Sequence, residues 1–178
     1  WAAGDGIPEV LVGDDDFRWS VLRRLATFGV LGDDEIAAAE AADRSLAGSL
    51  AALGVRAVRP TAQAKEWAWG RLRDDADLSN YAALAIAGGF STAPDSALVR
   101  PYVAQVGDLL VGLSGRMGDD AVSRVVSAMH PTSLVEDGTL EASAAMLARA
   151  DLTPGVRRAL VDANHELREA LASRRRFD

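Results

Sequence analysis

A histidine and a glutamate near the end of the chain are the residues that most resemble metal ligands. His165 and Glu166 begin a stretch that reaches Glu169, and a zinc-peptidase helix reads His-Glu-x-x-His. That motif needs a second imidazole one turn on, so that two neutral ring nitrogens meet one metal, but Glu169 stands there. His130, the other histidine, precedes a proline at a predicted helix end. We interpret His165 as solvated and His130 as a capping residue, and we predict no catalytic, cofactor-binding or metal-binding residue in this chain.

Clusters of aspartate are the second group with possible cation chemistry. They occupy residues 14–16, 33–34, 74–77 and 119–120. None has the alternating acids, central glycine and terminal glutamate that an EF-hand calcium loop needs. Each precedes a predicted helix, where carboxylates satisfy free N–H groups and the positive end of the helix dipole. We therefore predict that the clusters start helices and do not bind calcium or magnesium.

Two tryptophans lie close together in the sequence, at Trp67 and Trp69. Two residues apart on a helix, they cannot both face the core fully, so one is expected to line a surface. Packing between helices is the interpretation that we favour, and stacking on a ligand is the alternative. The chain has neither a Gly-Lys-Ser/Thr phosphate loop nor a G-x-S-x-G nucleophile turn. The sequence thus contains no complete active site.

The elements that carry these residues are all predicted to be helices. Apolar residues recur with a period near 3.6, and no segment alternates as a strand would. The predicted helices span residues 14–29, 34–44, 45–58, 61–73, 78–89, 97–115, 119–130, 139–149 and 153–176, after an irregular segment at 1–13. Short connections make consecutive helices antiparallel neighbours. We predict an all-α fold, a HEAT-like stack of antiparallel helix pairs, or α-solenoid, of about nine helices.

Several helices come with detailed expectations. The first is expected to bury Phe17, Val21, Leu22, Leu25 and Phe28 and to end at Gly29. The fifth is expected to open at the acidic turn 74–77 and to end at Gly88 and Gly89. Pro101 is early enough in 97–115 to be tolerated in a continuous helix. The last helix is expected to bury a stripe of Val156, Leu160, Ala163, Leu167 and Leu171.

Composition excludes some classes of partner. The formal charge of -7 and a pI near 4.8 argue against a nucleic-acid surface, which needs clustered basic residues. No apolar run is long enough to span a membrane, and the first residues do not resemble a signal peptide. Cysteine is absent, which favours a reducing compartment, and we predict a cytoplasmic location. The 178 residues suit a single helical domain, and because the chain starts at Trp1 we expect a fragment of something longer.

Two segments carry a family resemblance. Residues 16–29, DFRWSVLRRLATFG, are similar to the D-x-R-W-x-x-L-x-x-L-x-x-x-G pattern in the C-terminal helical domain of bacterial M1-family aminopeptidase N enzymes. Residues 59–72, RPTAQAKEWAWGRL, resemble the R-P-T-x-x-A-K-x-x-A-W-x-x-L segment of that domain. The tail from Leu152 to Arg176 also looks like the end of those proteins. The resemblance spans essentially the whole chain.

The resemblance implies the non-catalytic C-terminal domain of a zinc-dependent aminopeptidase. Such a domain forms a bowl over the zinc site and encloses the cavity for peptide substrates. Its partner is then the catalytic domain of its own chain, which holds zinc with His-Glu-x-x-His, a motif absent here. Arg18 and Trp19 are candidates to line the substrate cavity, with Arg18 facing a carboxylate. For both residues a structural role, an ion pair for Arg18 and core packing for Trp19, is the alternative.

A different class of function stays open at this point. A free-standing helical-repeat scaffold that binds a partner protein would have the same composition and the same lack of an active site. The gene itself discriminates the two: several hundred preceding residues with the zinc motif favour the peptidase, and a start codon close to Trp1 favours the scaffold.

Overall fold

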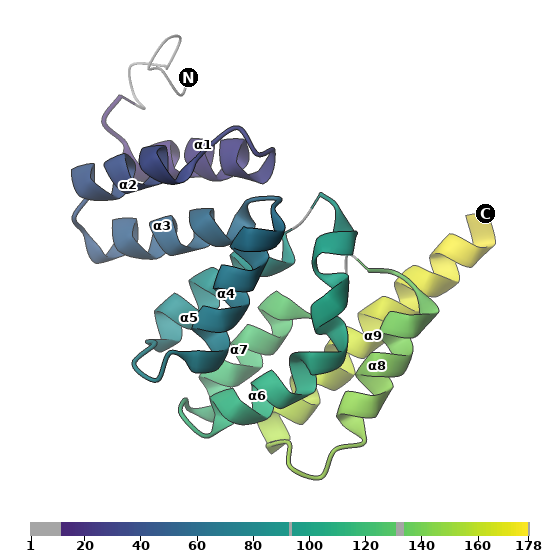
Figure 1. Cartoon of the computed structure of the whole chain (residues 1–178). Helices are drawn as coiled ribbons and strands as arrows, with labels where there is room; N and C mark the ends of the chain where they lie inside the picture. The colour runs from purple at the N-terminus through teal and green to yellow at the C-terminus, as the bar shows by residue number, and fades with distance from the viewer. Residues whose placement is uncertain (1–11, 93, 131–133, 178) are drawn as a thin grey trace.

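The structure, a computed structural model, describes residues 12–92, 94–130 and 134–177, and these residues form helices and connecting loops without a strand (Figure 1). The α-helices are α1 (Asp15–Thr27), α2 (Asp33–Ala42), α3 (Leu46–Val58), α4 (Ala62–Asp74), α5 (Asn80–Ser91), α6 (Val106–Ser114), α7 (Asp119–Met129), α8 (Asp137–Leu147) and α9 (Pro154–Phe177). Two 3₁₀ helices, η2 (Ser96–Leu98) and η3 (Arg100–Gln105), precede α6. The all-α prediction is confirmed; most of the predicted irregular segment 1–13 lies outside the described residues.

The helices stack in two layers. The odd-numbered helices form one layer, in which α1 packs on α3, α3 on α5, α5 on α7 and α7 on α9. The even-numbered helices cover them: α2 lies on α3, α4 on both α3 and α5, α6 on α7, and α8 on α9. The stack runs from α1 and α2 at one end to α8 and α9 at the other (Figure 1). This arrangement is the expected α-solenoid, in which each pair contacts mainly its neighbours.

Side-chain caps start several helices where the sequence predicts them. Asp14 Oδ1 accepts a hydrogen bond from Phe17 N at 2.9 Å, and Ser45 Oγ accepts one from Gly48 N at 2.9 Å. Thr61 Oγ1 accepts a bond from Ala64 N at 3.2 Å. These bonds satisfy N–H groups that have no partner inside the helix. Gly29 follows α1 with a φ of 72°, a left-handed conformation that glycine adopts without strain.

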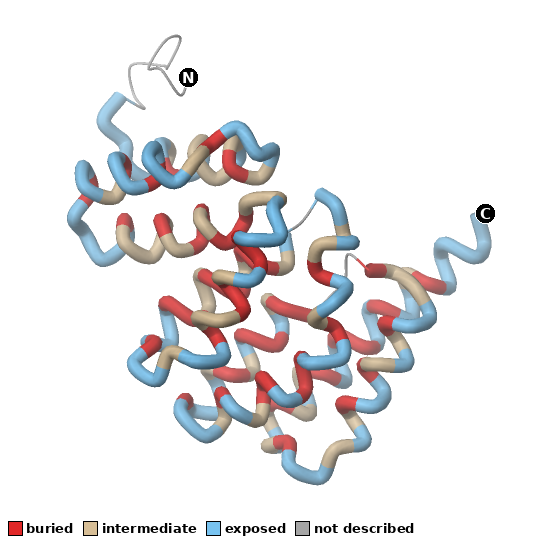
Figure 2. The backbone as a smooth tube through the Cα atoms, in the orientation of Figure 1, coloured by how far each residue is buried: buried red, intermediate tan, exposed pale blue. Residues whose placement is uncertain are grey.

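Buried residues form two hydrophobic cores. Figure 2 colours the backbone of buried residues red. The smaller core lies between α1, α2 and α3 and includes Trp19, Ile36 and Val55. The larger one extends from the end of α3 to α9. It includes Val156 and Leu160 of the predicted stripe of α9, and the other three stripe residues, Ala163, Leu167 and Leu171, are buried as well. The stripe could be predicted because its apolar residues recur with the helical period, and α9 packs on both α7 and α8.

The buried face of α1 differs from the expected one. Trp19 and Ala26 are its buried residues, Leu22 and Leu25 pack at the edge of the core, and Phe28 is 59% exposed. The helix ends at Thr27, so Phe28 lies outside it, beneath the Arg24 guanidinium at 4.8 Å from the ring centre. A helix that packs mainly on α3 buries a narrower stripe than its periodicity predicts.

The prediction for α5 was wrong at both ends. Ser79 caps the helix, with Oγ accepting from Ala82 N at 3.2 Å, while the preceding acidic turn folds on itself through Asp75. Gly88 and Gly89 lie inside the helix, which continues to Ser91. A Cβ on Gly89 would lie 2.5 Å from the carbonyl oxygen of Gly54, so glycine here allows α3 and α5 to approach closely.

The predicted continuous helix over 97–115 is also incorrect. Residues 100–105 form the 3₁₀ helix η3, and the α-helix begins only at Val106. Pro101 lies in the first turn of η3, and the tighter 3₁₀ turn places Val103 and Val106, three residues apart, on the same buried side. The ring centre of Tyr102 then lies 4.9 Å from that of Trp69, with the rings tilted, and 5.2 Å from that of Phe90, in an edge-on arrangement.

Candidate binding groove

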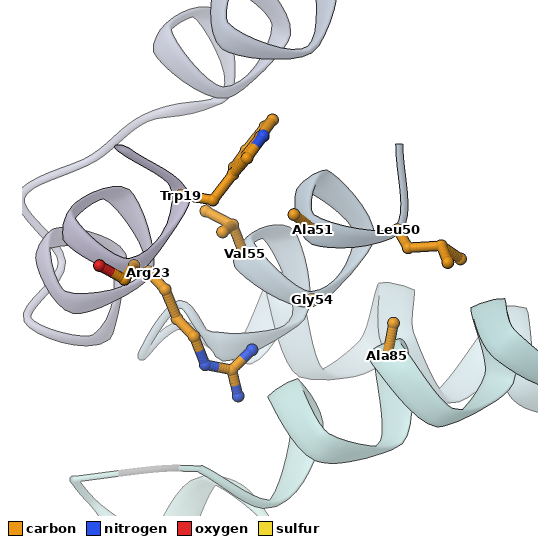
Figure 3. Close-up of a pocket in the computed structure, with 8 residues that line it drawn as sticks. Trp19, Arg23, Leu50, Ala51, Gly54, Val55 and Ala85 are labelled. Carbon is orange, nitrogen blue, oxygen red and sulfur yellow. The ribbon is translucent and has the colours of Figure 1, made fainter. Parts of the chain in front are cut away.

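A groove lies on the odd-numbered layer between α1, α3 and α5 (Figure 3). Its volume is about 310 Å³. The side chains that line it are mostly apolar and come from Trp19, Ser20, Arg23, Leu50, Ala51, Gly54, Val55 and Ala85. Helix α1 supplies the only charged side chain among these lining residues, that of Arg23. An apolar groove with one charged group is typical of a recognition site.

Arg23 extends from α1 past Gly54 toward α5 (Figure 3). Its Nη2 donates a hydrogen bond to the carbonyl oxygen of Gly88 at 3.1 Å. A Cβ on Gly54 would come within 3.0 Å of Arg23 Nη1, so the glycine leaves the space that the guanidinium occupies. Burial lowers the pKa of Arg23 because it removes water from the charged form. The ion pairs among the described residues do not include Arg23.

A second cation, Lys65 on α4, lies close enough to Arg23 for their charges to interact. Its side chain is fully buried. Its Nζ donates to the carbonyl oxygens of Ala57 at 2.8 Å, Gly89 at 3.1 Å and Thr92 at 3.4 Å. These carbonyls belong to the last turns of α3 and α5, where carbonyl oxygens lack helical N–H partners and the dipole is negative. Lys65 therefore joins the C-terminal ends of two helices that run side by side.

The charge of Arg23 acts on Lys65. Burial, together with a smaller contribution from the positive charge of Arg23, lowers the pKa of Lys65 to about 8. Both thus stand in surroundings that lack a neutralising carboxylate among the described residues, although the whole chain carries a charge of -7. Sequence reasoning missed both residues. The available signal was that Lys65 is the only lysine in the chain and lies in the segment shared with aminopeptidase N enzymes.

The predicted candidates Arg18 and Trp19 lie next to each other on α1 but in different surroundings. Trp19 is buried and lines the groove, and its Nε1 donates to Asp43 Oδ2 at 2.8 Å. Asp43 also accepts from Ser45 N at 3.0 Å, and the hydrogen bonds from Ser45 and Trp19 lower the pKa of Asp43. Arg18 is exposed and is not among the groove-lining residues. The groove thus includes one of the two candidates.

Neither histidine lines the groove, and the two differ in burial. His165 is exposed on α9. His130 is buried just after α7, with Nε2 at 3.1 Å from Ser143 Oγ on α8, and burial lowers its pKa to about 4. Within the described ranges, no three histidine, aspartate or glutamate side chains lie together as a metal ion would require.

The aspartate clusters have structural partners. Asp33 pairs with Arg59 at 2.8 Å, and Asp75 pairs with Arg71 at 2.8 Å. Asp119 begins α7 and also accepts a hydrogen bond from Gly155 N at 3.0 Å, so it caps α9. Capping and ion pairing account for these carboxylates.

Trp69 lies in the core and Trp67 is half-buried, as their spacing predicts. No described helix has both the length and the apolar character needed to cross a membrane.

Comparison with known proteins places this fold in a family. Residues 1–169 match the family model of the ERAP1-like C-terminal domain. Aminopeptidase N of Streptomyces lividans is 29% identical over 163 residues, which cover 92% of this chain and 19% of that protein. The chain thus spans about a fifth of the length of this relative. The helical stack and the match over nearly the whole chain agree, and the chain belongs to the ERAP1-like C-terminal domain family.

Proposed function

We propose that this chain is the C-terminal, non-catalytic domain of a zinc-dependent M1-family aminopeptidase. The observation that carries the proposal is the family match over residues 1–169 together with the similarity to an aminopeptidase N. In this proposal the chain is a fragment of a parent enzyme that removes N-terminal amino acids from peptides in the cytoplasm. The catalytic domain of the same parent holds the zinc ion and supplies the chemistry.

The role proposed for the helical stack is to cap the active site and enclose the substrate cavity. A two-layer stack of helices offers an extended rigid surface without needing reactive groups of its own. Rigid walls around a cavity orient a peptide and exclude bulky substrates. This division of labour is consistent with a domain in which many described charged residues form caps and ion pairs.

Peptide hydrolysis tests the proposal directly. The parent enzyme and the 178-residue chain are assayed on alanine- and leucine-naphthylamide, with zinc and with a chelator. We expect a chelator-sensitive parent and an inert chain. Inactivity of both would contradict the aminopeptidase assignment and leave the helical-repeat scaffold as the better hypothesis, and activity of the chain alone would contradict its non-catalytic role.

Arg18 and Trp19 remain the proposed residues of the cavity wall. Arg18 is an exposed guanidinium that can meet a substrate carboxylate, whereas buried Trp19 would contribute through the groove. In the parent enzyme we expect Arg18→Ala to raise KM for a peptide by roughly fivefold, as for one charge-assisted hydrogen bond, with kcat unchanged. Arg24→Ala, an exposed arginine on the same helix, is the matched control. Peptide kinetics identical to wild type for Arg18→Ala would exclude its substrate role.

A further inference from the structure

We infer that the groove between α1, α3 and α5 is a docking site for the catalytic part of the same parent chain. The segment that it receives carries a carboxylate, from aspartate or glutamate, beside an apolar side chain. This inference rests on the proposed function, because it takes the partner to be the rest of an aminopeptidase. It adds where on this domain the two parts meet and which chemistry holds them.

The positive charge of Arg23 in the groove indicates that the docked segment carries a carboxylate. Arg23 lines the groove, is half-buried, and has one hydrogen bond, to the Gly88 carbonyl, with no ion pair among the described residues. Lys65 is fully buried and does not line the groove, so it adds positive charge near Arg23 without contacting an occupant, and its hydrogen bonds go to carbonyl oxygens. Partly desolvated cations are stabilised most by an anion that accepts hydrogen bonds from them, and a guanidinium pairs best with a planar carboxylate. An acidic side chain from a partner complements this site.

Apolar residues continue the groove along α3 and α5. Leu50 and Ala85 line it, and Leu46 and Tyr81 lie four residues earlier on the same helices, hence on the same helix faces. The two helices run side by side in the same direction, since Lys65 bonds to the last turns of both. Leu46 is 72% exposed and Tyr81 is 70% exposed. We call these four residues the apolar strip.

The apolar strip favours a permanent partner. Large exposed apolar side chains grouped on one face mark surfaces that another protein segment covers. The Streptomyces relative has about four-fifths of its length outside the part that matches this chain. A segment from that remainder is tethered, so its effective concentration at the groove is high and docking needs no new encounter. A second copy of the chain or a peptide substrate would lack this advantage.

Cysteine labelling in the parent enzyme tests the inference. The chain has no cysteine, so Tyr81→Cys places a single thiol of this domain on the apolar strip, and peptide mass spectrometry resolves it from thiols elsewhere. We expect maleimide to label this thiol at least tenfold more slowly in the folded parent than in the urea-unfolded parent. Equal rates would overturn the inference, because the strip would then be open.

The role of the charge is tested in the same background. Adding Arg23→Gln is expected to raise the labelling rate at least fivefold, and Arg23→Lys, which keeps the cation, is expected to raise it less. Arg24→Gln removes a neighbouring exposed charge on α1 and should leave the rate unchanged. Val161→Cys, at an exposed position on α9, reports on the general reactivity of an accessible thiol and should label equally in every background. If the thiol of Tyr81→Cys is labelled at the same rate with and without Arg23→Gln, the proposed contact between Arg23 and a carboxylate is overturned.

Other occupants give different results. Protection that disappears on dilution would identify a second copy, and protection that appears only with added peptide would identify a substrate; either result overturns docking within one chain. The result of the naphthylamide assay does not depend on the result of the labelling experiment. A protected thiol in a parent without peptidase activity would preserve the docking site and contradict the proposed function.

Discussion

At the scale of single residues, two buried titratable groups link this fold to pH. Lys65 and His130 are both buried, and burial lowers the pKa of each below its ordinary value. The hydrogen-bond partners of both groups are uncharged. Lys65 bonds to main-chain carbonyls and His130 to a hydroxyl, so neither has an opposite charge to stabilise its protonated form. Stability is therefore expected to rise with pH in two separate windows.

The window of Lys65 lies at alkaline pH. Its pKa is about 8 in the folded chain and 10.5 in the unfolded chain, so between these values the unfolded state binds more protons and stability rises with pH. We expect wild type to gain about 2 kcal/mol in the free energy of unfolding between pH 7 and 9.5 relative to Lys65→Met. Urea denaturation at both pH values measures it. Parallel pH profiles for the two proteins would contradict the lowered pKa.

The window of His130 lies at acidic pH. Its pKa is about 4 in the folded chain and 6.5 in the unfolded chain, so stability falls as pH falls through this range. We expect wild type to lose about 2 kcal/mol between pH 7 and 5, and His130→Gln to lack this loss. His165→Gln, which removes the exposed histidine, is the control and should behave as wild type. A pH loss that survives in His130→Gln would assign it to other groups.

At the scale of elements, the close approach of α3 and α5 is tightest at Gly89. A Cβ on Gly89 would lie 2.5 Å from Gly54 O and 2.6 Å from Ala57 Cβ, both on α3, whereas a Cβ on the adjacent Gly88 meets nothing within 4 Å. The close approach also brings the Gly89 carbonyl to Lys65. The two glycines therefore allow a matched comparison, because a side chain at Gly89 would meet α3 and a side chain at Gly88 would have open space.

Alanine at the two positions should act in opposite directions. We expect Gly89→Ala to lower the free energy of unfolding by about 1–3 kcal/mol, because α3 and α5 must separate. Gly88→Ala should raise it by up to ~1 kcal/mol, since alanine favours the helix. Thermal unfolding followed by circular dichroism measures both. Similar melting temperatures for the two variants would show that α3 and α5 are not closely packed at Gly89.

At the scale of the whole molecule, the two cores make the first helices a semi-independent unit. The smaller core joins α1 and α2 to α3, and the buried bond from Trp19 Nε1 to Asp43 Oδ2 closes it. In a stack where each pair contacts mainly its neighbours, stability is close to a sum of local terms. Weakening this unit should open one end of the stack and leave the other closed.

Hydrogen exchange can show whether the end of the stack formed by α1 and α2 opens separately from the rest. We expect Asp43→Ala, which removes the acceptor of the Trp19 bond, to speed amide exchange in α1 and α2 and to leave α7 and α9 unchanged. Asp34→Ala, an exposed change at the start of α2, is the control. Faster exchange throughout the chain would mean that the two cores unfold together.

The sequence by itself determined the local features of this protein. Caps at Asp14, Ser45 and Thr61 and the buried stripe of α9 depend on residues within a few positions of each other, so periodicity and capping chemistry predicted them. The family resemblance was also in the sequence, and the match over residues 1–169 confirmed it. The prediction for Arg18 and Trp19 as substrate contacts stays a prediction.

Only the tertiary structure decided the features that depend on distant residues. A lysine normally indicates a surface, but Lys65 is buried because the carbonyl ends of α3 and α5 meet at its Nζ. Gly89 does not end α5, because glycine there serves contact with another helix. Arg23 lines a groove whose other walls come from residues some thirty to sixty positions later in the chain. Such placements follow from how helices pack, which periodicity along one helix does not specify.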